Sequence, residues 1–174
     1  MTHFARALGA AKTGKLDAAR EDIAKLVELS DKMLKAKDPY WAQIIDIQRQ
    51  VATSWVLSAE GKAGEALKAL AGAADAEDKT DKSPVTPGPL APARELYGVM
   101  LMENGMAKEA LAAFEATLVK EPNRFNAYAG AAQAAEKLGN SAKAKTYYGK
   151  LLELSAGVKS DRPVLAAAAR FMGK

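Results

Sequence analysis

Few residues in this sequence have the chemistry of a catalytic or metal-binding site. The chain has one histidine, His3, and no cysteine. A Ser-His-Asp arrangement or a histidine-based metal site would need His3, which lies in the first turn of a predicted helix. We therefore interpret His3 as a surface or packing residue. The lack of cysteine excludes disulfides and thiolate metal sites, so we predict no metal and no nucleophilic catalysis.

Phosphate and carboxylate chemistry are not indicated either. The thirteen glycines are spread over predicted turns and helices, and residues 61–64 (GKAG) resemble a phosphate-binding loop only superficially. Four carboxylates have the chemistry needed for a catalytic pair, but no spacing places any two of them together: Asp46, Glu60, Glu95 and Glu103. The sequence therefore predicts a protein that is not an enzyme and uses no cofactor.

Composition narrows the class of protein and its partners. The 174 residues are 49% apolar and 26% charged, as in soluble globular proteins. No run of eighteen apolar residues and no secretory leader is visible, so we expect no membrane span and a cytoplasmic location by default. An exported location is the alternative if the chain is a trimmed piece of a longer protein. The net charge of +4 is interspersed rather than gathered on one face, so no nucleic-acid partner is expected.

The element most clearly encoded is a helical hairpin in residues 91–124. Its helices are predicted from Pro92 to Glu103 and from Ala107 to Glu121, with a glycine turn between them. Gly98 and Ala110 have almost no side chain, so the helix axes can come close there, with Phe114 filling the space beside that contact. A glycine inside a helix costs roughly 1 kcal/mol against alanine, which indicates that close approach compensates for it. An ordinary hairpin with a tolerated glycine is the alternative.

Repetition strengthens this interpretation. A glycine followed five residues later by an alanine opens a predicted helix four times, and a large apolar residue follows after four more positions. These triplets are Gly14/Ala19/Ile23, Gly61/Ala66/Leu70, Gly105/Ala110/Phe114 and Gly139/Ala144/Tyr148. The interval from Gly105 to Gly139 is 34 residues, the period of tetratricopeptide (TPR) repeats. The chain thus resembles the TPR family, most strongly over residues 91–155.

The match to that family is partial. Gly98, Ala110, Phe114 and Pro122 fit the pattern in the first clear unit, where Arg94 replaces an aromatic residue. The next unit has Tyr128, Gly139, Ala144 and Tyr148, with alanine for the helix glycine and for the terminal proline. The resemblance implies an all-α, right-handed superhelix of about four hairpins, an α-solenoid. We predict one domain over residues 1–174: two divergent hairpins (1–78), a connector (79–90), two TPR units (91–158) and a C-terminal capping helix (161–173).

The connector is rich in proline. Four of the seven prolines lie between Pro84 and Pro92, and Pro87-Gly88-Pro89 cannot form the interior of a helix. We expect a stiff extended segment. It is either a plain linker between two halves or a lid packed over one mouth of the superhelix, and long connectors in compact domains are compatible with both.

The resemblance also implies which residues line the concave groove. By spacing from the turn glycines they are Phe4, Leu8, Gln48, Val51, Trp55, Glu95, Val99, Met102, Asn126 and Gln133. This mixed apolar and amide surface does not contain the Lys and Asn clamp for a C-terminal carboxylate that the family is best known for. Trp55 is either a core residue or a binding anchor, because tryptophan is enriched at interaction hot spots.

These observations predict a noncatalytic scaffold that binds a peptide or a partner segment through its helical repeats. A small-ligand- or substrate-binding accessory domain of a larger protein is the alternative. A shallow groove would favour the first function, and a closed pocket beneath the proline-rich connector would favour the second. Self-association through the N-terminal hairpin is also possible, because no helix precedes it in the sequence to cover it.

Overall fold

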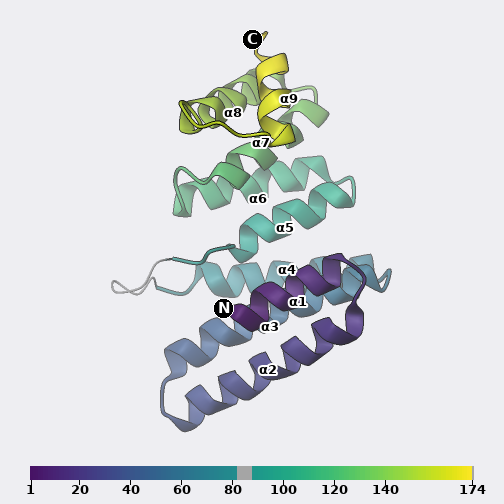
Figure 1. The fold of residues 1–174 in the computed structure, drawn as a ribbon, viewed down its shortest axis with the longest axis vertical. Helices are drawn as coiled ribbons and strands as arrows, with labels where there is room; N and C mark the ends of the chain where they lie inside the picture. Colours follow the sequence, from purple (N-terminus) through teal and green to yellow (C-terminus); the bar gives the residue numbers. More distant parts are fainter. Residues whose placement is uncertain (82–87, 174) are drawn as a thin grey trace. The chain divides into compact units, whose positions relative to one another are not determined.

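The computed structural model describes residues 1–81 and 88–173, and these ranges form nine α-helices and no strand. The predicted all-α class is therefore confirmed (Figure 1). The helices are α1 (Thr2–Lys12), α2 (Leu16–Lys35), α3 (Pro39–Ala59), α4 (Ala63–Asp78), α5 (Ala93–Glu103), α6 (Ala107–Lys120), α7 (Phe125–Lys137), α8 (Ser141–Leu154) and α9 (Pro163–Phe171). The chain groups into two compact units, Met1–Ala93 (unit 1) and Arg94–Lys174 (unit 2). The prediction of one continuous domain stays a prediction.

The four predicted glycine turns are present, and each reverses the chain between two helices. Gly14, Gly61, Gly105 and Gly139 have φ values from 69° to 79°, a region that side chains with a Cβ rarely adopt. After Gly105, the Met106 N–H donates to the Leu101 carbonyl at 2.9 Å, which pairs a carbonyl at the end of α5. The turn between α2 and α3 has the same bond but no glycine, since Lys37 takes the left-handed conformation with φ 58°.

Small residues pack where the repeat pattern places them. Ala19, Ala66, Ala110 and Ala144 are fully buried. The large residues four positions later, Leu70, Phe114 and Tyr148, are at most 1% exposed. Ile23 is the exception, because it is only half-buried while Asp22 and Leu26 take the interior positions of α2. The spacing therefore predicted the buried large residue correctly in three of the four triplets and incorrectly in the first.

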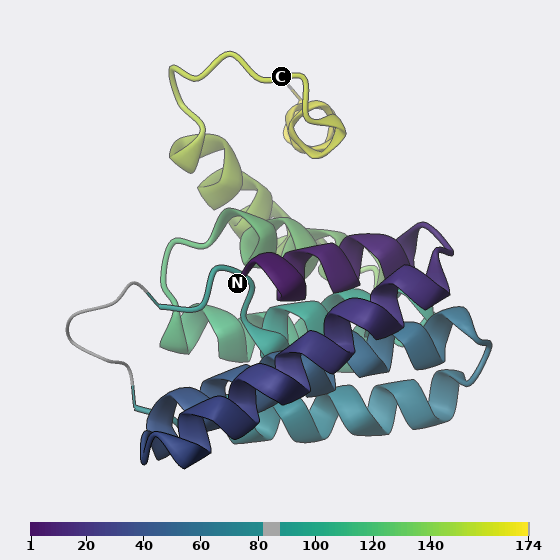
Figure 2. The same ribbon diagram turned by 60° about the horizontal axis from the view of Figure 1, so that its bottom comes forward.

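Unit 1 is built around α3, which packs against α1, α2 and α4. This arrangement explains why α3 is apolar on more than one side (Figure 2). Its start is fixed by Asp38, whose side chain accepts a hydrogen bond from the Trp41 N–H at 3.2 Å, and by Pro39 in the first turn. By contrast, α1 begins at Thr2, and Met1 precedes it without a side-chain cap bond.

In unit 2, α7 packs against both α6 and α8, and α9 packs against α8. Phe114 of α6 lies against the backbone of α5 at Gly98 and of α7 at Gly130. Phe171 of α9 packs on Tyr148 of α8, with the ring centroids 5.1 Å apart. No helix in the described residues is both long and apolar enough to cross a membrane.

Candidate functional site

The predicted groove residues of unit 1 lie where α1 packs against α3. Phe4, Val51 and Trp55 are 9%, 1% and 4% exposed, so they form the floor of this contact. Leu8 of α1 and Gln48 of α3 are half-buried and reach solvent. The structure therefore brings all five side chains to one pair of helices, but only Leu8 and Gln48 offer substantial surface to a partner.

A small cavity opens at one end of this contact. Its volume is about 40 Å³, and it is lined by Phe4, Ile47, Gln48 and Val51 together with Met1, Glu77, connector residues Pro89 and Leu90, and the following Ala91. A water needs roughly 10–15 Å³ of such space, so the cavity has room for a few waters at most. Pockets for small organic ligands measure about 300–1,000 Å³. The cavity is thus too small for such a ligand.

The described end of the connector therefore lines this cavity rather than lying away from the helices. Residues 82–87 of the connector, which we expected to form part of a linker or a lid, lie outside the described residues. Pro89, Leu90 and Ala91 lie beside α1 and α3, and Leu90 is 69% exposed.

Trp55 is held beneath the side chain of Lys12. The Lys12 ammonium lies 4.0 Å from the centre of the indole ring, a cation–π contact between α1 and α3. Within the described residues, the buried Nε1–H of Trp55 has no hydrogen-bond partner. Trp55 is thus a core residue in this structure, the first of the two interpretations of its role.

In unit 2, the predicted groove residues differ widely in exposure. Asn126 and Gln133 of α7 are exposed, seven residues apart on the same helix, whereas Val99 and Met102 of α5 are half-buried. Glu95 is 3% exposed and accepts two hydrogen bonds from the Arg124 guanidinium, at 2.8 and 3.2 Å. This bidentate pair ties the first turn of α5 to the start of α7. Glu95 is thus placed to hold helices together, and it offers almost no surface to a partner.

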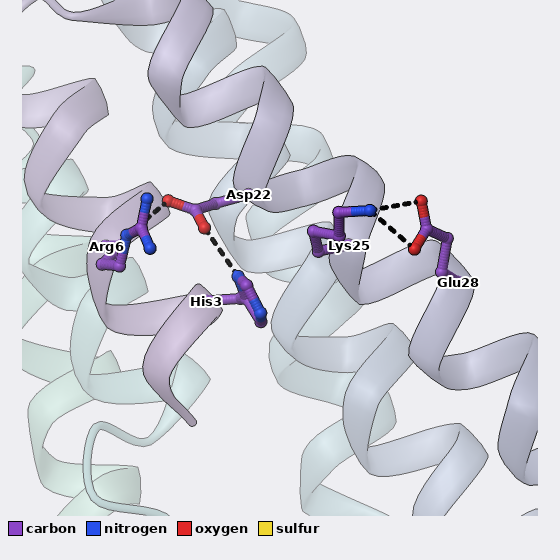
Figure 3. Close-up of polar contacts among 5 residues, drawn as sticks. All are labelled: His3, Arg6, Asp22, Lys25 and Glu28. Atoms are coloured by element: carbon purple, nitrogen blue, oxygen red, sulfur yellow. Dashed lines mark hydrogen bonds and ion pairs between the residues drawn. The ribbon is translucent and has the colours of Figure 1, made fainter.

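A second charged cluster, which was not predicted from the sequence, joins α1 to α2. Asp22 is 4% exposed, and its carboxylate pairs with His3 Nδ1 at 2.6 Å and with Arg6 Nε at 3.1 Å (Figure 3). One signal was available in the sequence, because Asp22 shares the helical spacing of the interior positions Ala19, Leu26 and Ser30. His3 is consequently a partner of a buried carboxylate.

A wide, open hollow of about 420 Å³ lies beside this cluster, lined by His3, Arg6, Glu21, Asp22, Ala24, Lys25 and Glu28. None of these residues has a hydroxyl or thiol that the His3–Asp22 pair could activate. Lys25 already binds both carboxylate oxygens of Glu28 at 2.9 Å (Figure 3). Across the described parts of the chain, no three or more His, Cys, Asp or Glu residues are grouped to hold a metal ion.

The polar network of unit 2 centres on Glu115 of α6. Its carboxylate accepts hydrogen bonds from Lys143 Nζ and from the Tyr147 hydroxyl, each at 2.5 Å. Partial burial raises the pKa of Glu115, but these two hydrogen bonds outweigh that effect and hold its pKa below the ordinary value of 4.5. Burial raises the pKa of Tyr147, and the bond to Glu115 raises it further. The network links α6 to α8.

The helices, turns and small-residue contacts define a TPR-like helical-repeat fold. A similar solved structure is PcrH from Pseudomonas aeruginosa, with a TM-score of 0.56 and 16% sequence identity. The similarity covers 74% of this chain and 89% of PcrH, and at this level of identity it shows the fold alone. No family model and no curated protein matches the sequence.

Proposed function

We propose that the chain is a noncatalytic protein-interaction module, a scaffold that binds a peptide or partner segment along the α1–α3 face of unit 1 and the α7 face of unit 2. The observation that carries this proposal is the character of the α1–α3 face. Leu8 and Gln48 reach solvent above a buried apolar floor, and the cavity there is only about 40 Å³. Such a shallow surface suits an extended protein segment, which is bound by many small contacts.

Unit 2 supports the same kind of surface through different residues. Asn126 and Gln133 of α7 are exposed amides that both donate and accept hydrogen bonds, so they can pair with the backbone of a partner segment. Glu95 contributes indirectly, by fixing the start of α7 through Arg124. The similarity to PcrH supports the helical-repeat framework that this proposal needs.

A small-ligand- or substrate-binding accessory domain of a larger protein is the second candidate function. One observation favours it, the hollow of about 420 Å³ beside His3 and Arg6, whose volume lies in the range of ligand sites. However, Asp22 already pairs with His3 and Arg6, and Lys25 pairs with Glu28. A charged ligand would have to compete with these pairs, which makes a protein segment on the α1–α3 face the better-supported occupant.

Site-specific photo-crosslinking tests the proposal. A benzoylphenylalanine is placed at Gln48 in one variant and at Gln133 in another, and each is irradiated in native lysate. Gln43 is the matched control, because it is an exposed glutamine on α3 and lies about 140° around the helix from Gln48. We expect a discrete adduct from Gln48 and Gln133 and none from Gln43.

The mass of the adduct identifies the class of partner. An adduct of twice the chain mass would indicate self-association, and a different mass would indicate another protein. Equal adducts from Gln43 and Gln48, or no adduct from any position, would refute the proposed binding faces.

A further inference from the structure

The described end of the connector lies on the α1–α3 face that we propose as a binding surface. We call residues 88–92 the strap. Pro89, Leu90 and Ala91 of the strap line the same small cavity as Phe4, Gln48 and Val51. In Figures 1 and 2 the teal segment leading into α5 passes beside the N-terminus, in agreement with the position of Met1 in that cavity. The strap therefore occupies part of this surface.

The strap is anchored at its C-terminal end. The backbone N–H of Ala93, directly after the strap, donates to the Glu77 carboxylate of α4 at 2.6 Å. This bond satisfies one of the unpaired N–H groups in the first turn of α5 and uses a charged acceptor. Glu77 also lines the cavity, so the anchor and the strap contact belong to one local arrangement.

The chemistry of the strap is that of a recognition segment. Its sequence, Gly-Pro-Leu-Ala-Pro, cannot form a helix, and its prolines favour an extended conformation with few backbone donors. Extended proline-containing segments bind apolar grooves at low entropic cost because they are already close to their bound shape. Phe4, Ile47 and Val51 supply apolar surface of this kind.

The fit of the strap is incomplete. Leu90, its largest side chain, is 69% exposed, and the cavity of about 40 Å³, which has room for a few waters, separates the strap from part of the helix surface. A segment that filled the cavity would make contacts that the strap does not make, and it could therefore displace the strap.

We propose that the strap is an intramolecular competitor for the α1–α3 face, which a partner segment must displace in order to bind beside Phe4, Gln48 and Val51. This inference rests on the proposed function. A competitor in the same chain weakens binding of a partner to the face. The apparent association constant equals the intrinsic one multiplied by the fraction of molecules in which the strap is not seated. The connector then regulates access to the surface in addition to joining the two units.

The test uses the full chain and a peptide copy of the strap, acetyl-Gly-Pro-Leu-Ala-Pro-Ala-amide. Two variants weaken the seated strap: Glu77→Ala removes the anchor, and Pro89→Gly/Leu90→Ser/Ala91→Gly removes the apolar contacts. Glu65→Ala is the matched control, because Glu65 is an exposed carboxylate on the same helix as Glu77. Circular dichroism verifies that each variant keeps its helices, and the amide NMR signals of Phe4, Gln48 and Val51 report binding.

We expect the strap substitutions alone to shift these three signals. We also expect the peptide to bind both weakened variants about tenfold more tightly than wild type or Glu65→Ala. A factor of about ten corresponds to a strap that is seated in about nine of ten wild-type molecules. A peptide in which both prolines are replaced by serine should bind more weakly to every variant. Unchanged signals in the strap variant, equal peptide affinity for all proteins, or no binding to any of them would each overturn the proposal.

Crosslinking at Gln48 separates this proposal from the proposed function. If the partner adduct forms equally in wild type and in the strap variant, the strap does not compete, and the binding face stands. If the peptide behaves as expected but no partner adduct forms at Gln48, the strap does occupy the face, and the proposed function there is wrong.

Discussion

The packing of Phe114 against two glycines leads to a sharp prediction about the core of unit 2. The ring is 1% exposed and lies against Gly98 of α5 and Gly130 of α7. A Cβ added at Gly130 would lie 2.5 Å from Cε1 and Cε2 of the ring, whereas ordinary contacts begin near 3.4 Å. At Gly98 the added Cβ would lie 2.8 Å from Cε1. The shortfall from 3.4 Å is at least 0.9 Å at Gly130, where the ring atom Cζ lies closer still, and 0.6 Å at Gly98, so Gly130→Ala is the more severe change.

Two opposing effects set the magnitude of Gly130→Ala. Alanine is favoured over glycine in a helix by roughly 1 kcal/mol. Overpacking a filled core costs about 1–3 kcal/mol, and the buried ring has little free space to move into. We take the upper part of that range at Gly130, so Gly130→Ala should destabilise unit 2 by about 1–2 kcal/mol. Gly98→Ala should be close to neutral.

The decisive experiment combines Gly130→Ala with removal of the ring. Phe114→Ala alone should cost about 3–5 kcal/mol, the usual range for a large buried aromatic. Removing the ring removes the three atoms nearest to the added Cβ, so Gly130→Ala should then stabilise by about 1 kcal/mol through helix propensity. The double variant should thus be more stable than Phe114→Ala alone. The coupling energy between the two sites should be about 2–3 kcal/mol.

Urea unfolding followed by circular dichroism measures these differences. Both tryptophans, Trp41 and Trp55, lie in unit 1, so indole fluorescence reports on that unit and assigns each transition. Gly149→Ala is the matched control, because Gly149 is helical in α8 and an added Cβ would meet only Met172 Cε at 4.0 Å. If Gly130→Ala were as stabilising as Gly149→Ala, or equally destabilising with and without the Phe114 ring, the packing argument would be refuted.

Three further changes test other parts of the structure. Glu95→Gln replaces the charged acceptor of Arg124 and should destabilise unit 2 by about 1–2 kcal/mol in urea unfolding, whereas the same change at the exposed Glu109 should have little effect. The pKa of Glu115 is lowered by folding, so its contribution to stability is present above pH 4.5 and is lost as the pH falls through the lower folded pKa. Glu115→Gln should therefore be less stable than wild type at neutral pH, and this deficit should shrink on acidification, in unfolding curves from pH 7 to 3. Trp55→Phe should cost less than about 1.5 kcal/mol, because the lost ring volume is partly offset by removal of an unpaired N–H, whereas Trp55→Ala should cost about 3–5 kcal/mol.

The turns and the closest helix contacts could be predicted from the sequence because both are encoded locally. A glycine in the left-handed conformation and an alanine five residues later specify a turn and a small contact face, as at Gly105 and Ala110. The role of Gly130 was not predicted, because the repeat pattern places the small residue of that helix at the position of Ala132. Both residues are in fact buried, and Gly130 is the one that contacts Phe114.

The exposure of the predicted groove residues could not be derived in this way. Spacing from the turn glycines identifies one side of a helix, but a partner distant in the sequence decides whether a side chain on that side is buried. Glu95 is covered by Arg124, which lies 29 residues away, and Trp55 is covered by Lys12 of a different helix. By contrast, Gln48 and Gln133 remain open to solvent.

The two buried carboxylates have a common role in a fold that depends on small residues. Contacts between alanine and glycine are similar from one helical turn to the next, so they discriminate poorly between a correct pairing of helices and one shifted by a turn. A buried ion pair discriminates strongly, because a shift would leave a charge without its partner in the interior. Asp22 with His3 and Arg6 joins α1 to α2, and Glu95 with Arg124 joins α5 to α7. We infer that these pairs fix the register of their helices, and hence the direction of the surface carrying Gln48 in unit 1 and Gln133 in unit 2.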